Sequence, residues 1–172
     1  HYRGGTDAVA LYLGQNPRSR MFDGKALILG GSHSPNYNLP HSLVGDLSAI
    51  LIENVSPFVN HFRIPSKEIA LLGDFEEKRE KIARENVTNL SGVPSWMLSV
   101  LTRVMDISGK THLEDVWPGI EVFFHGGVAF TPYREQYRQL VTASDMHYME
   151  TYNASEGFFG LQNDLQDRSM LL

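Results

Sequence analysis

The sequence of 172 residues contains no cysteine. Disulfide bonds and cysteine-ligated zinc sites are therefore excluded, and the composition fits a reducing compartment. No apolar run approaches the roughly 20 residues of a membrane-spanning helix, and the N-terminal residues do not have the basic and then apolar order of a secretory signal. We therefore expect a soluble protein with a cytoplasmic location and no membrane partner.

The sequence also has few positive charges. It contains 15 basic and 20 acidic residues, so the formal net charge is −5. The basic residues form no block or stripe that could follow a phosphate backbone, so nucleic acid is not an expected partner. The seven histidines are scattered without the spacing of a zinc site. With 42% hydrophobic residues, the chain is long enough to form one globular domain with a real core.

Apolar runs that predict strands alternate with amphipathic stretches that predict helices. The expected strands are residues 25–31, 87–92, 119–125, 147–152 and 158–162. The expected helices are residues 6–13, 46–62, 75–84, 94–107 and 131–141. Such alternation predicts an α/β fold with a largely parallel sheet covered by helices, and with an antiparallel piece at its end.

Prolines and glycines mark several expected boundaries. Pro57 divides the second helical stretch into two helices, because proline interrupts the helical hydrogen bonds. Pro94 suits the first turn of the clearest helix, and Gly109 suits its C-terminal end. Thr131 is the expected N-cap of the last helix, with Pro132 at the first helical position.

Three features of the first half are less regular. The continuous apolar run at 25–31 ends in two glycines, as in a strand that is buried on both faces. The polar residues 32–40 after it predict a turn. The helix at 75–84 runs almost directly into the strand at Val87, although such connections usually take a few residues. We therefore expect residues to be missing from this junction.

The stretch from Met149 to Gly160 carries the first candidate for function. Its alternating apolar run stops at small polar residues and a glycine before an aromatic run resumes, which predicts strand, tight turn and strand. Ser155 and Glu156 would then lie side by side at a strand end. Ligands of α/β proteins bind outside the carboxyl ends of the strands. An ordinary hairpin with a solvent-exposed tip is the alternative interpretation.

The preceding strand ends in the sequence His125-Gly-Gly-Val128, one helix earlier in the chain. Glycines at a strand end allow a flat ligand or a phosphate to approach backbone N–H groups. The later stretch supplies an aromatic ring at Tyr152, a hydroxyl at Ser155 and a carboxylate at Glu156. These groups suit a base, a phosphate oxygen and Mg²⁺ respectively. Together the two strand ends predict a site for a nucleoside triphosphate.

A serine hydrolase of the α/β-hydrolase type is an alternative that uses the same residues. The sequence His125-Gly-Gly resembles an oxyanion loop, and Asn153 to Gly157 is one residue away from the nucleophile elbow. However, an elbow is followed by a helix, whereas the residues after Gly157 are typical of a strand. The triad order also requires a histidine after the serine, and the last histidine is His147.

Five motifs stand out along the chain. They are Val93-Pro-Ser-Trp96, Val116-Trp-Pro118, Phe124-His-Gly-Gly-Val128, Pro132-Tyr-Arg-Glu-Gln-Tyr137 and Glu150-Thr-Tyr-Asn-Ala-Ser-Glu-Gly157. Together they resemble the Gretchen Hagen auxin-responsive family of acyl-acid amido synthetases, in its bacterial branch. The last motif is specific when it occurs with the upstream Gly-Gly element. The family belongs to the adenylate-forming superfamily, so the resemblance implies the α/β fold of a large N-terminal domain.

The resemblance also implies a reaction that uses ATP and Mg²⁺. A small carboxylic acid attacks the α-phosphate to give acyl-AMP and pyrophosphate, and an amine such as an amino acid then displaces AMP to form an amide. The implied nucleotide-binding residues are Gly126, Gly127, Val128, Tyr152, Asn153, Ala154, Ser155 and Gly157. Ser155 and Glu156 are the implied catalytic residues, with Glu156 as the metal ligand. Trp96 and Met97 are implied contacts of the acyl substrate.

Some parts of the family's pattern are not found in residues 1–172. They are the Ser/Thr-Gly-rich phosphate loop, the aspartate that binds the ribose hydroxyls and the mobile C-terminal subdomain. We therefore expect residues 1–172 to be a single α/β fragment of the N-terminal adenylation domain, without activity on its own. A non-catalytic module that binds a nucleotide or an acyl group is the alternative from a different functional class.

Overall fold

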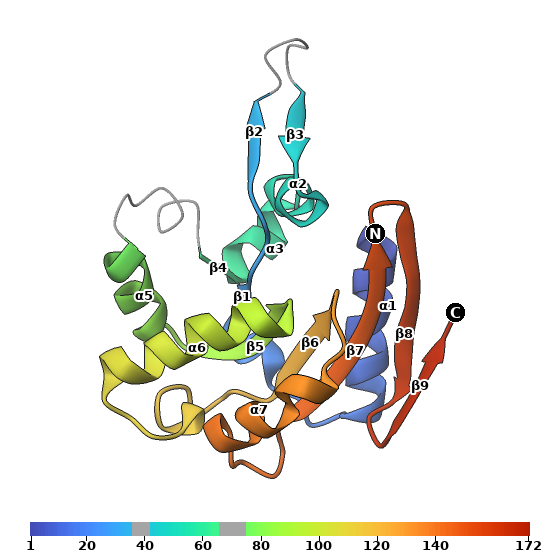
Figure 1. The fold of residues 1–172 in the computed structure, drawn as a ribbon. Coiled ribbons are helices and arrows are strands. Elements are labelled where there is room, and N and C mark those ends of the chain that lie inside the picture. Colours follow the sequence, from blue (N-terminus) through green and yellow to red (C-terminus); the bar gives the residue numbers. More distant parts are fainter. Residues whose placement is uncertain (36–41, 66–74) are drawn as a thin grey trace.

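The computed structural model describes residues 1–35, 42–65 and 75–172. Within these residues, seven strands form one sheet in the order β4-β1-β5-β6-β7-β8-β9 (Figure 1). Their bounds are β1 (Lys25–Ile28), β4 (Arg63–Ile64), β5 (Val87–Gly92), β6 (Val122–Gly126), β7 (His147–Ala154), β8 (Gly157–Asp164) and β9 (Asp167–Leu171). The strands from β4 to β7 in this order are parallel, and β8 and β9 are antiparallel. The expected α/β fold, with a largely parallel sheet and an antiparallel end, is confirmed.

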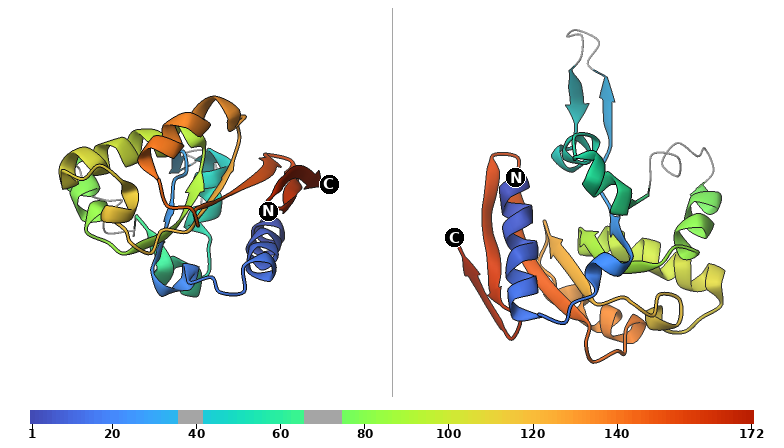
Figure 2. Two further views of the ribbon diagram at one scale, coloured as in Figure 1. Left: turned by 90° about the horizontal axis from the view of Figure 1, so that it is seen from below. Right: turned by 180° about the vertical axis from the view of Figure 1, so that it is seen from behind.

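Helices lie on both faces of this sheet, with α6 and α7 on one face and α1 on the other (Figure 2). The α-helices are α1 (Tyr2–Gln15), α2 (Leu47–Glu53), α3 (Pro57–Phe62), α5 (Phe75–Ala83), α6 (Pro94–Ser108) and α7 (Arg134–Leu140). The 3₁₀ turns are η1 (Met21–Asp23), η2 (Leu113–Asp115) and η3 (Thr131–Tyr133), and β2 (His33–Pro35) pairs with β3 (Leu43–Gly45) in a separate antiparallel ribbon. None of the described helices has the length and the apolar character needed to cross a membrane.

The alternation of side chains along β6 divides the core between the two faces. Val122 is fully buried on the α1 face, in a cluster with Tyr12. Phe123, the next residue, is fully buried on the opposite face with Leu101 of α6 and Tyr137 of α7. Successive side chains of a strand point to opposite faces, so a short strand can hold helices on both sides. The first residues of β6 are therefore packed between two layers.

Proline and glycine set the helix boundaries where the sequence predicts them. Pro57 is the first residue of α3, after the break that separates this helix from α2. Pro94 is the first residue of α6, and Gly109 follows its last turn with φ +66°. The N–H of Gly109 donates to the carbonyl oxygen of Met105 at 2.9 Å. Helix α6 thus begins at the carboxyl end of β5, next to the end of β6.

The prediction of Thr131 as the N-cap of a helix is wrong. Thr131 and Pro132 lie inside the 3₁₀ turn η3, and the α-helix begins at Arg134. The N–H of Tyr133 donates to the carbonyl oxygen of Phe130, three residues earlier, at 2.9 Å. The chain therefore makes one tighter turn before it enters α7.

The predicted strand at 25–31 is shorter and less buried than expected. It ends at Ile28, and only Leu27 is buried, because β4 pairs with no more than Ala26 and Leu27 along its other edge. The turn predicted for residues 32–40 is also wrong in part, because His33–Pro35 form β2. Residues 36–40 of that prediction lie outside the described residues.

The junction before β5 is a short connection. Helix α5 ends at Ala83, and three residues, 84–86, connect it to Val87. The connection is therefore one residue longer than predicted, because the helix ends at Ala83 and not at Arg84. Connections of this length are ordinary in α/β proteins. The expectation that residues are missing from this junction stays a prediction.

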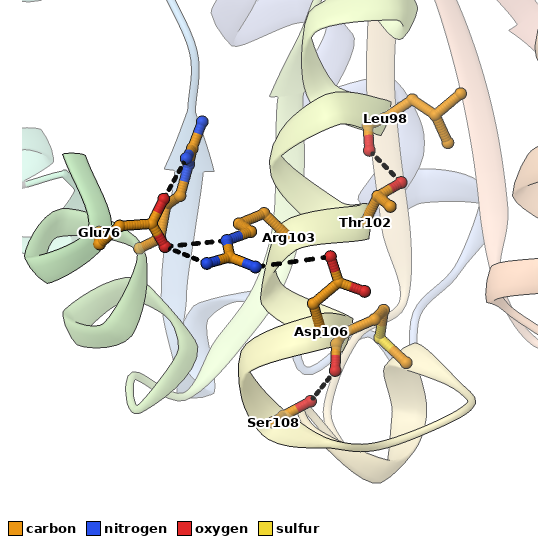
Figure 3. A network of polar contacts seen from close by, with 8 residues as sticks. Glu76, Leu98, Thr102, Arg103, Asp106 and Ser108 are labelled. Carbon is orange, nitrogen blue, oxygen red and sulfur yellow. Dashed lines mark hydrogen bonds and ion pairs between the residues drawn. The ribbon is translucent and has the colours of Figure 1, made fainter.

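An exposed group of charged side chains joins α5 to α6 (Figure 3). The guanidinium of Arg103 donates to Glu76 through Nε at 2.8 Å, and it also lies 3.7 Å from a carboxylate oxygen of Asp106. The hydrogen bond from Arg103 is the main cause that lowers the pKa of the Glu76 carboxyl. Because these side chains are solvent-exposed, the contact orients α5 on α6 more than it stabilises the fold.

Candidate functional site

The predicted strand, turn and strand around Ser155 are present at the carboxyl edge of the parallel sheet. Strand β7 ends at Ala154, Ser155 and Glu156 form the turn, and β8 begins at Gly157. The last residue of β6, Gly126, pairs with Thr151 of β7. The segment from residue 152 to the turn therefore continues beyond the end of the pairing with β6. We call residues 152–157 the hairpin tip.

The backbone geometry at the end of β6 requires glycine at both positions, whether or not a ligand binds there. A Cβ at Gly126 would lie 2.3 Å from the carbonyl oxygen of Thr151, so only glycine permits this approach of the two strands. Gly127 has φ +81°, and a Cβ there would lie 3.3 Å from Cγ2 of Val93. We call residues 126–128 the glycine loop. Its backbone lies between the hairpin tip and the beginning of α6.

Most residues of the hairpin tip are exposed, and only Ala154 and Gly157 are half-buried. The ring of Tyr152 is 53% exposed, and its centroid lies 5.6 Å from that of Phe159, which is also exposed. Ser155 and Glu156 are exposed in the turn. The tip thus presents an aromatic surface, a hydroxyl and a carboxylate without the burial that would be needed to keep water away from them.

The carboxylate of Glu156 fits a role in binding Mg²⁺ together with a substrate. In residues 1–35, 42–65 and 75–172, no group of three or more histidine, aspartate or glutamate side chains could hold a metal ion by itself. Mg²⁺ commonly takes one or two carboxylates and completes its ligands with water and substrate phosphates. A single exposed glutamate could supply the carboxylate of such a site.

The two predicted acyl contacts differ in accessibility. Trp96 is 50% exposed in the first turn of α6, close in the chain to Val93, which borders the glycine loop. Met97 is fully buried in the main core. The structure therefore places Trp96 where a ligand could reach it. Met97 has no exposed surface for direct contact, because the apolar face of α6 turns it towards the sheet.

His125 belongs to two of the sequence motifs, but no role was predicted for its side chain. Its side chain is 2% exposed and stacks on the ring of Phe130 at a centroid distance of 4.2 Å. Burial, and then the nearby charge of Arg134, lower the pKa of His125 to about 4. The imidazole is therefore neutral near pH 7, and it anchors the residues that follow the glycine loop. The strand alternation, which places His125 on the face of Phe123, was the available signal.

A hollow lies on the α7 face of β7 and β8. It is a cleft of about 340 Å³ whose lining includes Arg134, Glu150 and Gln162. The side-chain amide of Gln162 accepts a hydrogen bond from the N–H of Glu150 at 3.0 Å and so bridges the two strands. None of the residues predicted to bind the nucleotide or the acyl group lines this cleft. Arg134 and Glu150 belong to two of the five sequence motifs, but neither motif predicted a cleft on this face.

The structure does not support the hydrolase alternative. Ser155 lies in a hairpin turn and is followed by strand β8, where a nucleophile elbow requires a helix. His147, at the other end of β7, lies on the α1 face beside the ring of Tyr12. A serine–histidine pair of the triad type is therefore not formed by these two residues.

Comparison with known proteins gives one positive result. The model of the GH3 family N-terminal domain matches residues 5–146. No curated protein matches the chain. The matched region contains the glycine loop and Trp96, and it ends just before β7. The hairpin tip therefore lies outside the match.

Proposed function

Because the chain belongs to the GH3 (Gretchen Hagen 3) family of acyl-acid amido synthetases, we propose that it is part of an enzyme that adenylates a carboxylic acid. In this proposal ATP activates the acid as acyl-AMP, and an amine then takes the acyl group. The matching model is that of an N-terminal domain. We therefore also propose that residues 1–172 are part of the adenylation domain of a longer enzyme.

One observation carries this proposal. The glycine loop and the hairpin tip lie next to each other at the carboxyl edge of the sheet, joined where Gly126 packs against Thr151. Ligands of α/β folds bind at this edge. The loop offers the exposed residues Gly127 and Val128, and the tip offers a ring, a hydroxyl and a carboxylate.

Each part of the site has a proposed role. The glycine loop borders the adenine, and the exposed ring of Tyr152 packs on the base or the ribose. The remaining residues of the tip, which line the ribose and the phosphates, are Asn153, Ala154, Ser155 and Gly157. The hydroxyl of Ser155 donates to an oxygen of the α-phosphate. The carboxylate of Glu156 holds Mg²⁺.

The chemistry requires no covalent bond to the protein. A carboxylate oxygen of the acid attacks the α-phosphorus, the bond to the bridging oxygen breaks, and pyrophosphate leaves with the electron pair. Negative charge spreads over the α-phosphoryl oxygens during this step, so a fixed hydroxyl donor stabilises the transition state. Mg²⁺ neutralises phosphate charge when it is bound. In the second step the amine attacks the acyl carbon, AMP leaves, and the amine loses a proton.

The acyl group is placed near the first turn of α6. The exposed ring of Trp96 offers an apolar surface there, whereas Met97 supports that turn from inside the core. We propose direct contact for Trp96 and only indirect support for Met97.

The reaction can be tested with the full-length enzyme that contains this chain. Release of pyrophosphate from ATP should depend on an added carboxylic acid, and an amide should form when amines are added. A panel that spans aliphatic and aromatic acids and the common amino acids is required. The proposal is wrong if no acid in the panel promotes pyrophosphate release. Nucleotide binding without any turnover would instead favour the non-catalytic binding module.

The role of Glu156 gives a specific prediction. Glu156→Gln should lower the rate of acid-dependent pyrophosphate release by roughly 100-fold or more, because the transition state loses a fixed charged partner. The variant should also need a higher Mg²⁺ concentration for half-maximal rate. Glu135→Gln is a matched control, because Glu135 is exposed on α7 and pairs only weakly with Arg138 at 3.8 Å. Full activity of Glu156→Gln at ordinary Mg²⁺ concentrations contradicts the assignment.

A further inference from the structure

The glycine loop and the hairpin tip belong to different strands, and they meet at Thr151. Thr151 is the last residue of β7 that is paired on both sides, with Gly126 of β6 and with Leu161 of β8. Beyond it, β7 pairs only with β8, and the register shifts between Tyr152 and Asn153. On the side of β6, the tip is therefore connected to the sheet through the geometry at Thr151.

Two contacts fix this geometry. The hydroxyl of Thr151 donates to the carbonyl oxygen of His125, at a distance of 3.2 Å between Oγ1 and that oxygen. The backbone of Gly126 lies so close that a Cβ there would be 2.3 Å from the carbonyl oxygen of Thr151. The first contact uses the side chain, and the second uses only backbone. The side-chain hydroxyl is thus the part of the junction that a substitution can remove without disturbing the strand pairing.

The consequence for ATP follows from where its base and its α-phosphate would bind. In the proposed site the base lies on the glycine loop and the α-phosphate lies at Ser155, so one ligand touches both sides of the junction. A Cβ at Gly127 would lie 3.3 Å from Cγ2 of Val93, so the loop also approaches the residue that precedes α6. An error of about 1 Å between two binding groups can cost a large factor in rate.

We propose that Thr151 is a positioning residue for ATP, which sets the spacing between the glycine loop and the hairpin tip through its hydrogen bond to His125. This inference rests on the proposed function. Thr151 does not touch the reacting atoms. Its hydroxyl acts through the backbone at the end of β6.

The test uses Thr151→Val in the full-length enzyme, because valine keeps the shape of threonine and removes the hydroxyl. The KM for ATP should rise roughly 5- to 10-fold, the effect of one lost hydrogen bond, while the KM for the carboxylic acid stays unchanged. Thr151→Ser keeps the hydroxyl and should remain within about twofold of the wild type. Thr142→Val is the control, because it removes a hydroxyl that donates to Glu114 before the start of β7.

Several outcomes would overturn the inference. An unchanged KM for ATP in Thr151→Val contradicts the positioning role of Thr151. A fall in kcat for all substrates together with a lower Tm, and without a change in KM, indicates a purely structural role. If Thr151→Val does not fold, the comparison of Thr151→Ala with Thr151→Ser tests the same difference in KM.

The failure of the proposed function can be recognised separately. Affinity for ATP can be measured directly with a fluorescent ATP analogue, without turnover. If the wild type binds the analogue but releases no pyrophosphate with any acid, the ligase proposal fails. The Kd values of the Thr151 variants then still decide whether this hydroxyl positions the nucleotide.

Discussion

Gly126 and Gly127 illustrate how one residue type meets two requirements at the same place. The sequence predicted that glycines here would allow a ligand to approach the backbone. In the structure, Gly126 is required by its contact with Thr151, and Gly127 by its positive φ. The packing reasons do not depend on a ligand. A role in binding adenine therefore stays a prediction that only binding data can test.

His125 should make the fold sensitive to acid. Its pKa is lowered to about 4, whereas an unfolded histidine has a pKa near 6.5. Protons therefore bind preferentially to the unfolded chain. The stability linked to His125 is fully present above pH 6.5, and it is lost as the pH falls towards 4. At pH 5 the loss should be on the order of 2 kcal/mol.

The measurement is urea unfolding at pH 7 and pH 5. His125→Phe should lose less stability between these two values than the wild type, because phenylalanine cannot be protonated and can still stack on Phe130. His61→Phe serves as the control, since His61 is exposed at the end of α3. Equal pH dependence of His125→Phe and the wild type contradicts the assigned pKa.

The contrast between Trp96 and Met97 shows what the sequence could not decide at the residue scale. Both lie in the first turn of α6, and both were expected to contact the acyl substrate. Which of two neighbours faces the core depends on the rotation of the helix on the sheet. That rotation is set by distant partners such as Tyr137, whose hydroxyl donates to the carbonyl oxygen of Pro94 at 2.8 Å.

At the scale of elements, α6 has the most complete set of local signals, and its end gives a clear prediction. Gly109→Ala should lower the free energy of unfolding by about 1 kcal/mol, because alanine is strained at φ +66°. Open space surrounds this position, so no steric contact adds to the cost. Chemical denaturation measures the change.

The matched control for this substitution is Gly14→Ala. Gly14 lies inside α1 and also faces open space. Alanine favours a helix interior, so this variant should be as stable as the wild type or more stable. If Gly109→Ala is as stable as Gly14→Ala, the left-handed conformation at Gly109 does not affect the free energy of unfolding, and the prediction is wrong.

Elements without such local signals were predicted less well. Pro132 suits the first turn of an α-helix as well as a 3₁₀ turn, so the sequence could not distinguish η3 from the start of α7. The end of β1 depends on β4, which offers it only Ala26 and Leu27 as paired neighbours. Strand length is determined by pairing between distant segments, and a local apolar run does not contain that information.

At the scale of the whole molecule, the alternation of helices and strands was sufficient to predict the α/β class. The order of the strands was not predictable in the same way, since the paired residues of β1 and β5, such as Lys25 and Val87, are 62 or 63 positions apart and other elements lie between them. The juxtaposition of the glycine loop with the hairpin tip follows from the neighbouring positions of β6 and β7. The cleft on the α7 face arises from side chains of several elements, so no single stretch of sequence indicates it.

The projection of the hairpin tip beyond β6 has a consequence for amide hydrogen exchange. Amides near Leu90 and Phe123, which are fully buried in the centre of the sheet, should exchange only when the whole domain unfolds. Amides of residues 153–157 should exchange through local opening of the tip, orders of magnitude faster. Mass spectrometry of peptides from the two regions can measure this difference, and equal protection would contradict it. Bound ATP should slow amide exchange in the hairpin tip and leave the exchange rate in the centre of the sheet unchanged. Comparison of the two exchange rates therefore distinguishes ligand binding from a change in global stability.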